Sequence, residues 1–282
     1  MRFRVSALAI AACVIALPLC AQTKHDSVPQ FLTPSSSSLA QTIQTTPEQL
    51  RRTEPPSASM SAEELEQRGD ELRTAKFYAD AMDYYNAAIA KHETAELRDK
   101  LGICQLQMMR MREAKKEFER AVKLQKDYAV AYNNLAVVYY IERNNGKAIK
   151  YYRRAIKLNP DAASFHSNLG SALFAKKDYE HASQEYARAM QIDPLIFERR
   201  GRGGISAALT PEDRAEFSYT LAKLYLKVGD VQHCLQYLRK AQEDGIQVAS
   251  RINSDPVFEK YRKDARFIAV IEHAPIPLTD PQ

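Results

Sequence analysis

The sequence predicts an all-α protein in which antiparallel helix pairs stack into a solenoid. Apolar residues recur at helical spacing through most of the chain, and a pattern of small and aromatic residues returns every 34 residues. No stretch has the alternating pattern of a convincing strand. Two short helices cannot bury both of their apolar faces alone, so each pair needs a neighbour of the same kind.

Residues 129–162 are the clearest unit. Two apolar stripes at helical spacing predict two helices: Tyr132, Leu135, Ala136 and Tyr139 in the first half, and Ala148, Tyr152, Ala155 and Leu158 in the second. The turn-like residues 144–146 separate them. Pro160 closes the unit, because proline cannot extend a helix.

The same pattern recurs in 62–94, 95–128, 163–196 and, more weakly, 215–248. One position is always small: Gly69, Gly102, Ala136, Gly170 and Ala222. Glycine inside a helix costs about 1 kcal/mol relative to alanine, so its use here needs a packing reason. We expect the two helices of a unit to approach closely at this position, with a facing Tyr or Phe filling the adjacent space.

This 34-residue helix–turn–helix period resembles the tetratricopeptide repeat over residues 62–248. The resemblance implies a right-handed superhelical solenoid of about five repeats. The chain departs from the family in having no Trp at the first aromatic position, which is occupied by Leu65, Arg98, Tyr132, His166 and Ser218.

Residues 1–21 are typical of a secretory signal peptide, with Arg2 and Arg4 ahead of an apolar run and cleavage expected after Ala21. The expected location is therefore periplasmic or secreted, in a bacterium. Lipid modification at Cys20 and an uncleaved anchor are the alternatives. Residues 22–60, rich in Ser, Thr and Pro, are expected to form a disordered tether.

Four repeats are expected within 61–196, starting at Ser61, where Glu64 completes a capping box. An insertion, 197–214, precedes the fifth repeat at 215–248. The insertion ends in Thr210-Pro211, a helix-start signal. Two short helices in 249–273 are expected to cap the last repeat, followed by a loose tail, 274–282.

Catalytic and metal-binding motifs do not stand out. The histidines form no metal-ligand pattern, and neither a phosphate loop nor a nucleophile elbow is present. Cys104 and Cys234 fall in different repeats and are expected to be buried and unpaired. A net charge of +5 is too mild to indicate nucleic acid. We therefore expect no enzymatic activity, no cofactor and no metal.

The resemblance implies a concave groove, lined by the first helices, that holds a peptide or a partner helix. Carried over to this chain, its positions are Asn133, Val137, Tyr140, Ser167, Ser171, Phe174, Tyr219, Lys223 and Lys227. The acidic edge formed by Glu63, Glu66 and Asp70 is interpreted as a solvated face. Within the insertion, the segment 199–204 is interpreted as a solvated linker, with anion contact by Arg199, Arg200 and Arg202 as the alternative.

The predicted function is a non-catalytic, exported interaction scaffold that binds a peptide or a partner protein. Nucleic acid is not expected as a partner, and a membrane only if the N-terminus is lipidated or uncleaved. One alternative is a lipid-anchored envelope assembly factor modified at Cys20. Another is a carbohydrate-associated accessory module of an exported enzyme system, which the lack of Trp disfavours.

Overall fold

A computed structural model describes residues 54–199 and 210–272 of the chain. The predictions for the signal peptide, for Cys20 and for nearly all of the tether fall outside these residues. So do the tail and most of the insertion.

Ten helices of the described residues form five consecutive antiparallel pairs. They are α1 (Ala62–Thr74) with α2 (Tyr78–Lys91), α3 (Ala95–Gln107) with α4 (Met111–Leu124), α5 (Ala129–Ile141) with α6 (Asn145–Leu158), α7 (Ala163–Ala175) with α8 (Tyr179–Ile192), and α10 (Pro211–Lys227) with α11 (Val231–Glu243). The second helix of each of the first three pairs packs on the first helix of the next. The described part of the chain contains no strand.

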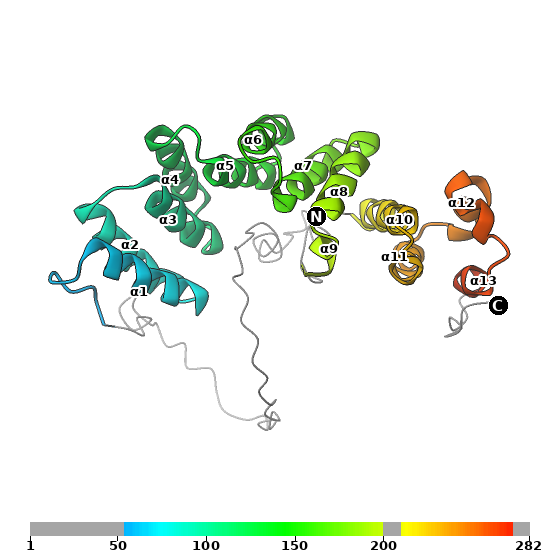
Figure 1. Cartoon of the computed structure of the whole chain (residues 1–282), viewed down its shortest axis with the longest axis horizontal. Coiled ribbons are helices and arrows are strands. Elements are labelled where there is room, and N and C mark those ends of the chain that lie inside the picture. Colours follow the sequence, from blue (N-terminus) through cyan, green and yellow to red (C-terminus); the bar gives the residue numbers. More distant parts are fainter. Residues whose placement is uncertain (1–53, 200–209, 273–282) are drawn as a thin grey trace, which may run out of the picture.

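The helix pairs follow one another along an open arc from α1 to the C-terminal helices (Figure 1). Large side chains that are almost fully buried, such as Tyr85, Phe118, Tyr152 and Tyr186, recur along the interior. The predicted fold class, an all-α solenoid of about five helix pairs closed by C-terminal helices, is confirmed.

The small residue of each unit lies where its two helices approach most closely. A Cβ atom added to Gly170 would lie 2.6 Å from the Tyr186 ring, well inside van der Waals contact. Gly69 and Gly102 stand in the same relation to Tyr85 and Phe118, also at 2.6 Å. The packing reason expected from the sequence is therefore present in three of the pairs.

The turn within each pair uses one residue in the left-handed region. Lys76, Met109, Arg143 and Lys177 have φ between 61° and 65°, and Gly229 has φ 84° at the corresponding place. The sequence suggested 144–146 as the turn of the third unit. The structure instead begins α6 at Asn145, and the side chain of Asn144 caps it by accepting a hydrogen bond from the Lys147 amide (3.2 Å).

The first residues of the insertion pack against the repeats, whereas nearly all of 199–204 falls outside the described residues, so its interpretation as a solvated linker stays a prediction. A short helix, α9 (Ile196–Arg199), buries Phe197 edge-to-face against Tyr186 and Phe217, at ring-centroid distances of 5.4 and 6.4 Å. These rings join the fourth pair to the fifth. Thr210 then caps α10, which begins at Pro211, four residues before the expected start of the fifth repeat.

The two short helices expected at the C-terminal end are present as the 3₁₀ helix η5 (Pro256–Tyr261) and α13 (Ala265–Ile271), and a further helix, α12 (Val248–Ser254), precedes them. Asp255 caps η5 and Asp264 caps α13. Phe258 and Phe267 are fully buried in the same core as the last repeat, so these segments cover its apolar face.

Replacing Gly170 with alanine tests the close approach. The new methyl group would overlap the Tyr186 ring, which Phe197 and Phe217 hold in place. We expect a loss of about 1–3 kcal/mol in the free energy of unfolding, despite the better helix propensity of alanine. Gly146→Ala is the control, because nothing lies within 4 Å of its added Cβ. Equal urea midpoints for the two variants would contradict the expected overlap.

Candidate partner-binding surface

The structure encloses most of the groove positions predicted in the middle repeats. Asn133, Val137, Ser167, Ser171 and Phe174 are between 0 and 3 % exposed. Val137 and Phe174 belong to the main hydrophobic core. These side chains therefore hold neighbouring helices together and are closed to a ligand in this conformation. Their burial is not what an open groove would show, and their expected role in binding stays a prediction.

One polar member of this set, Asn133, belongs to a ladder of hydrogen bonds between consecutive first helices. Asn168 Nδ2 donates to Asn133 Oδ1 (2.9 Å), and Asn133 Nδ2 donates to Asn134 Oδ1 (3.1 Å). Asn134 Nδ2 then donates to both carboxylate oxygens of Asp99, at 3.0 and 3.2 Å. The ladder links α3, α5 and α7, so it contributes to the contact between repeats.

Asp99 is buried, and its burial raises the pKa of its carboxyl group to about 7, although the hydrogen bond from Asn134 acts in the opposite direction. An unfolded chain loses this proton near pH 4, whereas the folded chain keeps it until about pH 7. The charged form is therefore disfavoured in the fold. Asp99 lowers the stability progressively as the pH rises between these two values, and fully above the higher one.

Asp99→Asn should stabilise the protein at pH 8, because it removes the buried charge and keeps an oxygen for Asn134. We expect a gain of at least about 1 kcal/mol, since one pKa unit corresponds to about 1.4 kcal/mol. The gain should nearly vanish at pH 4, where Asp99 is neutral in the fold. Asp127→Asn, at an exposed aspartate, is the control. A loss of stability at pH 8 in urea titrations would show that the carboxylate is tolerated in the core.

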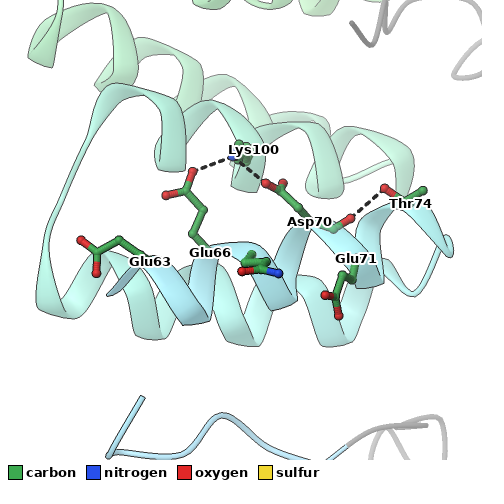
Figure 2. Close-up of a pocket in the computed structure, with 7 residues that line it drawn as sticks. Glu63, Glu66, Asp70, Glu71, Thr74 and Lys100 are labelled. Atoms are coloured by element: carbon green, nitrogen blue, oxygen red, sulfur yellow. Dashed lines mark hydrogen bonds and ion pairs between the residues drawn. The ribbon is translucent and has the colours of Figure 1, made fainter. Parts of the chain in front are cut away.

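An open pocket of about 720 Å³ lies on α1 at the N-terminal end of the solenoid (Figure 2). Its lining is mostly acidic: Glu63, Glu66, Gln67, Asp70, Glu71, Thr74 and Lys100. Lys100 reaches across from α3 and binds both Glu66 and Asp70 (2.5 and 2.8 Å). The acidic edge, interpreted from the sequence as a solvated face, is thus one wall of a pocket that α1 and α3 build together.

Asp70 is fixed from several sides. Tyr85 OH donates to its Oδ1 (2.7 Å), and Arg73 lies 3.3 Å from the same oxygen. Burial raises the pKa of Asp70, but the hydrogen bonds from Lys100 and Tyr85 outweigh it and leave that pKa lowered. Burial likewise opposes the charge on Lys100, yet Asp70 and Glu66 raise its pKa overall. The pairing of Asp70 with Lys100 therefore favours the charged form of both groups.

A second pocket, of about 410 Å³, contains the predicted residues of the fifth repeat. Its lining comes from α8, α10 and the C-terminal segments: Tyr179, Glu180, Ser183, Gln184, Glu216, Tyr219, Thr220, Lys223, Lys227, Arg251 and Asp255. Asp255 accepts from Tyr219 OH (3.2 Å) and pairs with Lys223 (2.6 Å). Lys227 is exposed beside them. Here the structure brings Lys223 and Lys227 together at the pocket surface, whereas Tyr219 is only 3 % exposed and lies beneath them.

The remaining predicted residues are Tyr140, the three arginines of the insertion and the two cysteines. Tyr140 is partly buried and packs against the main core. Arg199 ends α9, and its side chain, like Arg200 and Arg202, lies outside the described residues, so anion contact stays a prediction. Cys104 and Cys234 are buried free thiols, and burial raises the pKa of Cys104 to about 12.

Within residues 54–199 and 210–272, no group of three or more His, Cys, Asp or Glu side chains could hold a metal ion. None of the helices described there is long and apolar enough to cross a bilayer.

The third and fourth helix pairs match known families. Two family models, both described as the tetratricopeptide repeat, match residues 129–162 and 163–194. The protein contains tetratricopeptide repeats. A search of the curated proteins found no match to the sequence.

Several solved structures resemble the tetratricopeptide-repeat solenoid. A crystal structure of MamA is 22 % identical, with a TM-score of 0.44, and the match covers 62 % of this chain and 93 % of that one. TTC0263, a thermophilic TPR protein from Thermus thermophilus, is 19 % identical, with a TM-score of 0.47 and coverages of 75 and 100 %. YrrB, titled a TPR protein with an unusual peptide-binding site, is 17 % identical, with a TM-score of 0.44 and coverages of 72 and 92 %.

Sequence reasoning missed the residues that complete the two pockets. Lys100 lies 34 residues after Glu66, so opposite charges at one repeat length were the available signal. Arg251 and Asp255 come from the C-terminal segments, and no repeat position indicated that they would face Tyr219 and Lys223.

Proposed function

We propose that this chain is a non-catalytic scaffold that binds an extended segment of a partner protein, using the α1 pocket as its principal site. The observation that carries the proposal is this pocket, in which Lys100 holds Glu66 and Asp70 in place and Glu63 and Glu71 remain exposed. Four carboxylates line the pocket, and the three cations that pair with them are Lys100, Arg73 on Asp70 and Arg68 on Glu71, which leaves an excess of one negative charge. A segment that carries Lys or Arg complements it.

The fold supports this role because it provides an extended surface for contacts with another protein. Tetratricopeptide repeats stack helices into an extended surface, and extended peptides bind along such surfaces through backbone and side-chain contacts. The second pocket, with Lys223 and Lys227, offers a further contact of mixed charge for a longer partner.

We further propose export after signal-peptide cleavage. The charged start and apolar run of residues 1–21 support it. The mass of the mature chain decides between the sequence alternatives. A first residue Gln22 supports a free exported scaffold, a lipid-modified Cys20 supports an anchored one, and an uncleaved chain contradicts export by this route.

A randomised peptide array probed with the full chain tests the binding site. We expect enrichment of peptides with Lys or Arg, and binding that weakens with salt. Glu63→Gln combined with Glu66→Gln should lower the affinity for a selected peptide about tenfold or more, because each lost charge contact contributes on the order of 1 kcal/mol. Isothermal titration calorimetry gives the affinities.

Glu243→Gln combined with Glu259→Gln is the matched control, since it removes two exposed carboxylates far along the chain. Equal losses in the two variants would show that the binding reflects overall charge, and no enrichment of any peptide would contradict the proposed site.

A further inference from the structure

The outer helix of the third repeat, α6, carries several positively charged side chains and no negatively charged one. α6 contains five basic residues and no acidic one: Lys147, Lys150, Arg153, Arg154 and Lys157. All five are exposed. Four of them follow spacings of three, four and three residues, which places them on one side of the helix in a row about 15 Å long.

The acidic residues of the third repeat do not neutralise this row. Residues 129–162 contain two acidic residues, and each forms an ion pair with a cation of a neighbouring repeat. Glu142 pairs with Lys115 (3.5 Å) and Asp161 pairs with Arg188 (3.3 Å). Among the described residues, none of the five α6 cations forms an ion pair with a carboxylate. The positive charge is therefore left facing solvent.

Arg154 shows the difference from the flanking repeats most directly. Arg120 and Arg188, at the equivalent positions, each bind a carboxylate 27 residues earlier in the chain. Asp127 occupies that earlier position for Arg154, yet the Arg154 guanidinium lies over the Tyr132 ring instead, 5.5 Å from its centroid.

A stack of tyrosines supports the basic row. Tyr151 lies between Tyr132 and Tyr139, with ring-centroid distances of 6.4 and 5.4 Å. Lys147 lies 5.2 Å from the Tyr139 centroid. An aromatic ring attracts a cation without cancelling its charge, so the stack positions two of the basic groups and leaves them available.

We propose that the outer surface of α6 docks on an anionic phospholipid membrane. α6 lies at the outer edge of the arc (Figure 1), where a flat surface can reach it. Each Lys or Arg close to an anionic membrane contributes about 1 kcal/mol of attraction, so a row of four is sufficient for reversible attachment. The chain's predicted N-terminal signal also brings it to a membrane during export. This surface is separate from the α1 pocket, so the membrane proposal does not depend on peptide binding there.

Cosedimentation of the full chain with vesicles tests the proposal. Binding is expected to vesicles that contain phosphatidylglycerol and to weaken with added salt, whereas pure phosphatidylcholine vesicles should bind much less. The test variant combines Lys147→Gln, Lys150→Gln, Arg154→Gln and Lys157→Gln. Its affinity for anionic vesicles should fall by about tenfold or more.

The control variant combines Lys76→Gln, Lys176→Gln, Lys177→Gln and Lys263→Gln, which removes the same charge from exposed sites elsewhere. Both variants keep the N-terminal segment, and unchanged urea midpoints exclude unfolding as a cause. Equal losses in the two variants, or equal binding to neutral vesicles, would overturn the proposal. Binding to soluble polyglutamate but not to anionic vesicles would assign the row to an acidic protein partner and would also overturn it.

Discussion

The close approach of two helices at one small residue is the constraint on which this solenoid depends. At Gly69, Gly102 and Gly170 the partner ring occupies the space that a side chain would need, so each pair is held at one distance. Because the pairs have the same shape, they can stack in the same way along the chain. Two of the rings filling these contacts, Phe118 and Tyr186, belong to the continuous core that reaches the C-terminal segments, whereas Tyr85 belongs to a separate cluster at the N-terminal end.

This stacking decides where a partner can bind. In the middle of the solenoid the first helices lie so close that Asn133 and Ser171 are buried and hydrogen-bonded within the protein. At the two ends fewer helices pack over the surface, and pockets remain open beside α1 and α10. The central outer helix α6, in contrast, offers a row of positive charge on its exposed side. The molecule thus presents different chemistry at its ends and along its outer edge.

Features that depend on a local sequence pattern could be predicted from the sequence. Features that depend on side chains from distant parts of the chain could not. Helix periodicity, the capping box at Ser61 and the Thr210 cap are encoded within a few residues, and the structure contains them. Val137 is buried because neighbouring repeats cover it, and its position within its own repeat does not predict this. Similarly, Phe197 stands in a segment rich in Arg and Gly, and only the fourth and fifth pairs explain its burial.

Thiol labelling most directly tests the central claim that the solenoid is closed in its middle and open at its ends. Glu66→Cys places a thiol in the α1 pocket, and Ser171→Cys places one in the ladder region, which is 3 % exposed. With sites assigned by peptide mass spectrometry, the buried Cys104 and Cys234 serve as internal references. We predict fast modification at position 66, and modification at position 171 only on unfolding. Equally fast modification at both positions would contradict this claim.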